Sequence, residues 1–242
     1  MTERARAAES GERGGPQLIP RPETAQPGAP APWAGILPED RHVDLARVLN
    51  AMRRVGPAKP SPWEPPVGAM RSAVLVPLFE EDGSAWVVLT RRSQHLRSHK
   101  GEVAFPGGRQ DEGESLMDAA LREAREEIGL DTAFVEIVGE LDHLATVSSN
   151  SSIVPYVGVL PGPPVRLTPN PDEVEAVLTV SLDELLQDDV FRTELWDWQA
   201  ATGLSGPRPV HFFDLYGDTI WGATGRMLVN LLSIAMGVEH PG

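Results

Sequence analysis

The stretch GEVAFPGGRQDEGESLMDAALREAREEIGL, residues 101–130, decides the fold because a loop rich in Gly and Pro runs directly into an amphipathic helix. The spacing of its apolar residues predicts a helix over 115–128, with Ser115 at the N-terminal cap and Gly129 as the C-terminal stop. The predicted helix has one stripe that would face the core, which comprises Met117, Ala120, Leu121, Ala124 and Ile128.

Three glutamates, Glu123, Glu126 and Glu127, gather on the other side of this predicted helix, related as i, i+3 and i+4. Such a cluster can be a solvated charged face, or it can hold a hard divalent cation, which prefers oxygen ligands. The loop segment FPGG, residues 105–108, favours the second alternative, a cation site. Gly107 and Gly108 allow a sharp turn and a close approach of the backbone, and a free carbonyl there could complete the shell of the metal.

Apolar and β-branched runs surround this helix and predict strands. Residues 71–92, RSAVLVPLFEEDGSAWVVLTRR, predict a hairpin that turns at EEDGS. Because strands and helices interleave along the chain, the sequence predicts an α/β domain with a mixed sheet between helices. Further strands are predicted over 133–144, 152–160, 173–180 and 209–222, and further helices over 38–55, 181–187 and 223–237.

Composition excludes several classes of function. The formal net charge of −14 disfavours a nucleic-acid-binding surface, which normally needs a basic stripe. No apolar run is long enough for a transmembrane helix, and no cysteine is present. We therefore expect a cytoplasmic protein that binds neither nucleic acid nor a membrane. Residues 1–35, rich in Pro and Gly, are expected to form a disordered tail before one domain over 36–242.

Gly108, Glu114 and the run REAREEIGL at 122–130 match the complete Nudix box, GX5EX7REUXEEXGU, with Ala124 where a larger aliphatic residue is common. The chain thus resembles the Nudix hydrolase family. The resemblance implies an α/β/α sandwich with a mixed β-sheet, and hydrolysis of a nucleoside diphosphate linked to another group. It also implies a Mg²⁺ or Mn²⁺ site whose ligands are the Gly107 carbonyl and the carboxylates of Glu123, Glu126 and Glu127.

The catalytic roles implied by the resemblance fall mostly on the same helix. Glu123 and Glu126 would act together with the metal, and Arg122 would orient the glutamates rather than touch the substrate. The general base is left open, since it could be a helix glutamate or one from a later loop. In the later segment NPDEVEAV, Glu173 is the candidate base and Glu175 is its rival.

A second motif lies just upstream. LTRRSQHLRSHKGEVAFPGG, residues 89–108, resembles the signature of the coenzyme A pyrophosphatase branch, roughly LLTXRSXXLRXHXGXVXFPGG. The resemblance implies cleavage of coenzyme A into 3′,5′-ADP and 4′-phosphopantetheine. Arg92 and Arg97 are the candidate phosphate ligands because Arg can grip phosphate bidentately, although a basic solvent-facing turn is the alternative. His99 could contact the substrate or only pack and hydrogen-bond.

Other readings stay open. The same chemistry could act on ADP-ribose, a dinucleotide or a nucleoside triphosphate. A catalytically silent domain that senses a nucleotide is a different class, but it would usually have lost a glutamate of the box, and all are present here. A homodimer is also possible, because the predicted helices over 43–55 and 223–237 could pair with a second copy or pack on their own sheet.

Overall fold

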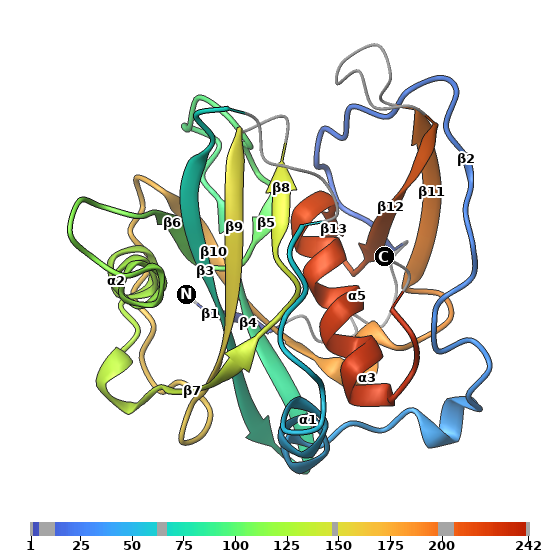
Figure 1. The fold of residues 1–242 in the computed structure, drawn as a ribbon, viewed down its shortest axis with the longest axis horizontal. Helices are drawn as coiled ribbons and strands as arrows, with labels where there is room; N and C mark the ends of the chain where they lie inside the picture. The colour runs from blue at the N-terminus through green and yellow to red at the C-terminus, as the bar shows by residue number, and fades with distance from the viewer. Residues whose placement is uncertain (1, 5–12, 62–66, 147–149, 198–205, 241–242) are drawn as a thin grey trace.

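The computed structural model describes residues 2–4, 13–61, 67–146, 150–197 and 206–240 (Figure 1). Its central feature is a mixed sheet in the order β1-β10-β4-β3-β9-β7, to which β5, β6 and β8 add short pairings. β3 runs parallel to β9 and antiparallel to β4. The strands are β1 (Thr2–Arg4), β3 (Met70–Glu81), β4 (Ser84–Arg92), β5 (Val103–Ala104), β6 (Gly107–Arg109), β7 (Glu136–Glu140), β8 (Leu144–Thr146), β9 (Ser151–Val159) and β10 (Val174–Ser181).

The predicted hairpin is confirmed by β3 and β4. Its turn uses Asp82 and Gly83, both with positive φ (52° and 81°), as expected for a tight connection between twisted strands. Along β3 the side chains alternate between two cores: Leu75 joins one, whereas Val76 and Leu78 join the other. The central strands are therefore covered on both faces.

Helices cover the two faces of this sheet, with α2 on one side and α1 and α5 on the other (Figure 1). Ala120, Ala124 and Ile128 of α2 pack in the core on their side, and the apolar residues of α5 fill the opposite core. This confirms the predicted α/β/α sandwich with a mixed sheet. The helical segments are η1 (Pro38–Asp40), α1 (Leu45–Met52), α2 (Leu116–Ile128), η2 (Thr132–Phe134), α3 (Leu182–Leu185) and α5 (Gly222–Met236).

A second sheet lies beyond α5, in the order β13-β12-β11-β2 (Figure 1). The sequence predicts one strand and a turn in its C-terminal part and does not predict β11. Phe213 and Ile220 of this sheet pack in the same core as α5, so the sheet adds a further layer to the sandwich. Its strands are β2 (Gln26–Pro27), β11 (Phe191–Asp197), β12 (Pro207–Asp214) and β13 (Thr219–Trp221).

The helix predicted over 38–55 is wrong in its first half. A short 3-10 turn, η1, comes first, and α1 starts only at Leu45, because the Asp44 carboxylate accepts a hydrogen bond from Arg47 N (2.6 Å) and caps a new helix. α1 and α5 pack in the core of their own domain, which is one of the two expected alternatives. No helix in the described part of the chain is long and apolar enough to span a bilayer.

Residues 13–35 differ from the expected disordered tail. Trp33 is fully buried, with its ring centroid 5.1 Å from that of Phe191. Arg21 pairs with Glu194 (2.7 Å), and Gln26–Pro27 forms β2 on the edge of β11. The low apolar content of the segment misleads because one Trp can bury a large area when a distant sheet provides its pocket. The extent of the domain stays a prediction.

Candidate active site

The helix α2 is built as its sequence predicts. The Ser115 hydroxyl accepts a hydrogen bond from Asp118 N (3.1 Å), and Gly129 ends the helix in the left-handed conformation with φ of 66°. The predicted core stripe is correct except at Met117, which is 39% exposed. Glu127 instead is buried, at 3% exposed, so the helix carries a carboxylate into the protein rather than only toward solvent.

Arg122 connects the glutamates to the preceding loop. Its guanidinium holds Glu114 with two hydrogen bonds, Nη2 to Oε1 (2.9 Å) and Nε to Oε2 (3.2 Å), and so braces the loop against the helix. Nη1 donates to Glu123 and Glu126, both at 3.0 Å, and Nη2 donates to the Arg109 carbonyl at 3.0 Å. Its donors are committed to these groups, and the orienting role in catalysis that the resemblance implies for Arg122 stays a prediction.

Glu127 lies at the centre of the site. Its carboxylate accepts a hydrogen bond from Gly107 N (3.2 Å) and lies 3.8 Å from Arg92 Nη1. Burial raises the pKa of Glu127 to about 8, against the opposing influence of Arg92 and the Gly107 amide. The charged form of this side chain is therefore poorly compensated by the protein alone.

Glu123 lies beside Glu127 and is also partly buried. A β-carbon at Gly108 would collide with the Glu123 carboxylate, so only a glycine lets the loop approach this closely. Burial raises the pKa of Glu123, although the hydrogen bond from Arg122 opposes the shift. Glu126, by contrast, is exposed at the edge of the site and turned toward Arg122.

The segment before β10 brings Glu173 to the same place. Its carbonyl accepts a hydrogen bond from Ser93 N (2.8 Å), and the nearby Asn170 N donates to the Glu127 carbonyl (2.8 Å). The charge of Glu173 contributes to the raised pKa values of both Glu123 and Glu127, so Glu173 lies within electrostatic range of both.

Glu175, the rival of Glu173, lies elsewhere. Its carboxylate is 3.5 Å from Arg91 Nη1 and is largely exposed. Of the two candidate bases, Glu173 is the one that the fold brings to the glutamates of α2.

The predicted phosphate ligands lie at the end of β4, where Arg92 is the last residue of the strand, and on the loop that follows it, where Arg97 lies. Arg92 is half-buried beside Glu127, and its Nε is buried without a hydrogen-bond partner among the described residues. Arg97 is exposed and, within the described ranges, forms no hydrogen bond or ion pair. A cation with unused donors beside buried carboxylates is what an anionic substrate with a bound metal would need.

His99 lies on the same loop but is already engaged. Its Nδ1 lies 2.9 Å from Glu102 Oε2, and this hydrogen bond raises the pKa of His99. The residue has a positive φ of 56°, and the neighbouring Gly101 also has a positive φ, so the pair closes the loop. His99 therefore has a role in loop structure, and Glu102 is a partner that no motif in the sequence indicated.

The donor set suits a hard divalent cation. Every side-chain donor is a carboxylate oxygen, and Glu123 and Glu127 are two carboxylates whose raised pKa values a nearby positive charge would lower. Among the described residues, however, no three such side chains already converge as a metal cluster. Glu126 points to Arg122 instead, so a change of its rotamer would be needed for it to join Glu123 and Glu127.

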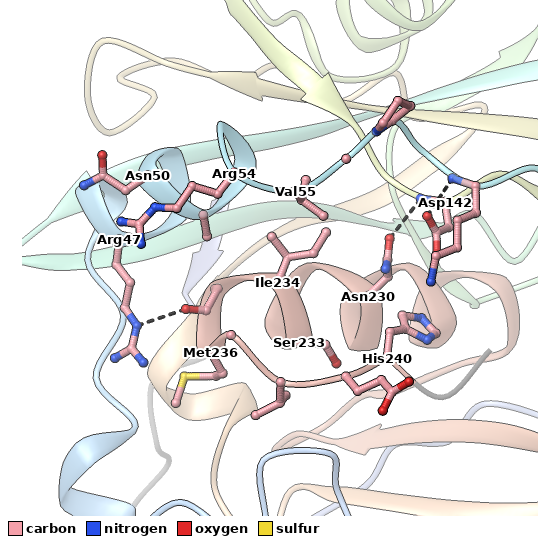
Figure 2. A pocket seen from close by; sticks show the side chains of 18 residues that line it. Arg47, Asn50, Arg54, Val55, Asp142, Asn230, Ser233, Ile234, Met236 and His240 are labelled. Atoms are coloured by element: carbon pink, nitrogen blue, oxygen red, sulfur yellow. Dashed lines mark hydrogen bonds between the residues drawn. The ribbon is translucent and has the colours of Figure 1, made fainter.

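A cavity on another part of the molecule is separate from this site. It has a volume of about 710 Å³ and lies between α1 and the C-terminal half of α5 (Figure 2). Arg47, Arg54, Asp142 and Asn230 are among its lining side chains. It is on the opposite face of the sheet from α2, so it is no part of the glutamate cluster (Figure 1).

An α/β/α sandwich with glutamates on the helix that follows a glycine-rich loop is the architecture that the Nudix resemblance implies. Residues 69–200 match the model of the NUDIX domain, and the chain belongs to this family. Hydrolases of the family generally use divalent metal ions.

The chain is also similar to two curated proteins that are named Nudix hydrolases. The chain is 47% identical over 172 residues to Nudix hydrolase 3 of Caenorhabditis elegans, a match that covers 67% of this chain and 72% of the relative. It is 40% identical over 171 residues to the chloroplastic Nudix hydrolase 22 of Arabidopsis thaliana, covering 68% of this chain and 55% of that protein. The chain thus spans only about half the length of the plant relative.

Among solved structures, the fold is similar to that of a MutT/nudix family protein from Enterococcus faecalis. The match has 18% sequence identity and a TM-score of 0.45, and it covers 80% of this chain and 70% of the other.

Proposed function

We propose that this protein hydrolyses the diphosphate bond of coenzyme A or a coenzyme A derivative, with Mg²⁺ or Mn²⁺, and releases 3′,5′-ADP and 4′-phosphopantetheine. The observation that carries the proposal is the position of Arg92. This residue of the coenzyme A pyrophosphatase signature lies 3.8 Å from Glu127 of the Nudix box. The two motifs, distinct in the sequence, therefore meet at one site.

Charge supports an anionic substrate at this place. The protein as a whole has a formal net charge of −14 and would repel a phosphorylated ligand. Arg92 and the exposed Arg97 provide local cations with unused donors beside the glutamates. Arg97 would bind a phosphate of the substrate away from the scissile bond, and Arg92 would bind close to the scissile diphosphate.

The chain's own groups would share the remaining tasks. A divalent cation held by Glu123, Glu126, Glu127 and the Gly107 carbonyl would neutralise the diphosphate oxygens and acidify a bound water. Arg122 keeps Glu123 and Glu126 in position through its hydrogen bonds. Glu173, whose charge acts on Glu123 and Glu127, would accept the proton of the attacking water.

A substrate panel tests the proposal. The purified protein is incubated with Mg²⁺ and coenzyme A, ADP-ribose, a dinucleotide or a nucleoside triphosphate, and the products are separated by chromatography. We expect 3′,5′-ADP and 4′-phosphopantetheine, with the highest kcat/KM for a coenzyme A species. Preference for a substrate without the pantetheine arm would contradict the coenzyme A assignment, and nucleotide binding without hydrolysis would contradict the enzyme assignment.

Arg97→Ala provides a second test of the same proposal. Removing a cation that grips phosphate should raise KM for coenzyme A by about tenfold, since charge-assisted hydrogen bonds contribute on the order of 1–3 kcal/mol. Arg53→Ala is the matched control, because Arg53 is also exposed but follows α1 on the opposite face of the sheet. An unchanged KM in Arg97→Ala would remove this residue from the substrate site.

A further inference from the structure

Two adjacent arginines at the end of β4 serve different faces of the sheet. Consecutive residues of a strand point in opposite directions. Arg92 accordingly meets Glu127 on the α2 side, whereas Arg91 forms a bidentate ion pair with Asp218, Nε to Oδ1 (2.8 Å) and Nη2 to Oδ2 (2.6 Å). Arg91 is therefore engaged by another part of the protein and is not aimed at the glutamate cluster.

Asp218 lies in the connection between β12 and β13 and is only 4% exposed. Its Oδ1 also accepts a hydrogen bond from Gln17 Nε2 (2.7 Å), and Gln17 in turn accepts one from Thr219 N (2.9 Å). Three segments far apart in the chain thus meet at one carboxylate. Two of them, at Gln17 and Asp218, lie outside residues 69–200, which match the family domain.

The loop that follows β4 is closed by hydrogen bonds to Arg92. We call residues 93–101 the substrate loop. Arg92 N donates to the Glu102 carbonyl (2.9 Å), and Gly101 N donates to the Arg92 carbonyl (3.1 Å), so both ends of this loop are held at Arg92. The next amide, of Ser93, donates to the carbonyl of Glu173. Any rotation of the strand end at Arg91 would therefore move Arg92, the substrate loop and Glu173 together.

We propose that Asp218 is a positioning residue that holds Arg92 and the substrate loop in register through Arg91. The inference rests on the proposed function for its kinetic consequences. A buried ion pair is costly to desolvate and is not needed merely to join two layers, which apolar contacts do as well. A bidentate pair does fix the direction of a guanidinium, and here it does so one residue before the proposed phosphate ligand.

Amide hydrogen exchange on the full chain tests the positioning without relying on activity. In Asp218→Asn, peptides covering residues 92–102 should exchange about tenfold faster than in the wild type, because loss of a local anchor lowers the free energy of local opening. Peptides from α5 should be unchanged. Unchanged exchange over 92–102 in a folded variant would overturn the inference.

Steady-state kinetics provide the second readout. With coenzyme A as substrate, Asp218→Asn should raise KM about tenfold and change kcat less than about threefold, since the glutamates of α2 keep their own brace through Arg122. Equal loss of kcat and of kcat/KM, with KM unchanged, would overturn the inference. If the wild type hydrolyses nothing in the panel, the proposed function fails, and the exchange experiment still decides the role of Asp218.

Two further variants separate positioning from general damage. Glu194→Gln is the matched control, because Glu194 is also a buried carboxylate of the second sheet and pairs with an arginine, Arg21 (2.7 Å), away from Asp218. It should leave exchange over 92–102 unchanged; an equal increase there would overturn the inference. If Asp218→Asn does not fold, Arg91→Lys, which keeps the charge and loses the bidentate geometry, carries the same expectations and the same contradicting results.

Discussion

At the scale of single residues, burial separates three glutamates that look equivalent in the sequence. Glu127 is 3% exposed with a pKa raised to about 8, whereas Glu126 is exposed and pairs with Arg122. Buried carboxylates with raised pKa values mark functional sites more often than exposed ion pairs do. Glu127 is therefore the side chain of α2 whose neutralisation should matter most.

Glu127→Gln should lower kcat by roughly 10²–10⁴-fold, because it removes a charge on which the proposed metal site depends while keeping the hydrogen bond from Gly107 N. Turnover at saturating Mg²⁺ measures the effect. Glu112→Gln, in the exposed loop before the helix, is the control and should retain activity. Near-full activity in Glu127→Gln would contradict the metal assignment.

His211 predicts a pH dependence of stability. Burial lowers its pKa to about 4, from 6.5, while its Nδ1 lies 3.1 Å from Thr193 Oγ1. Since the unfolded chain then binds a proton that the folded protein does not, this stability is present above pH 6.5 and is lost as pH falls toward 4.

The loss should amount to roughly 2–3 kcal/mol, given that each pKa unit corresponds to about 1.4 kcal/mol. Denaturant unfolding between pH 7 and pH 4 measures it, and His211→Gln should show a shallower decline than the wild type. His42→Gln, at an exposed position, should decline as the wild type does. Parallel curves for His211→Gln and the wild type would contradict the assignment.

At the scale of elements, the close approach of β6 to α2 shapes the site. The loop before α2 is braced by Glu114 and Arg122, and the backbone at Gly108 passes directly over the Glu123 carboxylate. The position of the Glu123 carboxylate therefore depends on both β6 and α2, and a shift of either element would move it.

Gly108→Ala should reduce kcat by roughly 10–100-fold, because the new β-carbon forces the Glu123 carboxylate out of its place, and misplaced groups cost about that much. Initial rates with coenzyme A test this. Gly162→Ala is the matched control, since a β-carbon there meets no atom within 4 Å. Wild-type rates in Gly108→Ala would show that Glu123 tolerates displacement.

At the scale of the whole molecule, the second sheet and residues 13–35 are part of the folded protein. Trp33 fills a pocket against Phe191 and Phe213, and Asp218 reaches back to Arg91 on the main sheet. The layers outside the central sandwich thus contact both its core and the strand that leads into the substrate loop.

Trp33→Ala should lower the free energy of unfolding by about 3–5 kcal/mol, the usual cost of removing a fully buried Trp. Leu18→Ala, at a position 94% exposed, should change it by less than about 0.5 kcal/mol. Urea denaturation measures both. Equal, small effects of the two substitutions would contradict the packing of Trp33 and would favour the disordered tail that the composition of residues 1–35 predicts.

The local pattern was sufficient where a structure depends on neighbours in the chain. The hairpin over 71–92 and the capped helix after Ser115 both follow from spacing, because these contacts span few residues. The two motifs likewise predict that residues 89–108 and the glutamates of the following helix belong to one candidate site.

Only the tertiary structure decided which of these side chains are buried and what they meet. It carried Glu127 into the interior, brought Glu173 rather than Glu175 to the cluster, and turned Arg91 away toward Asp218. These outcomes depend on contacts between distant segments, such as Arg91 and Asp218, which are 127 residues apart. Contacts of this kind produce no periodic pattern in the sequence. The sequence by itself determined the chemistry available to this protein, and long-range packing determined which groups can use it.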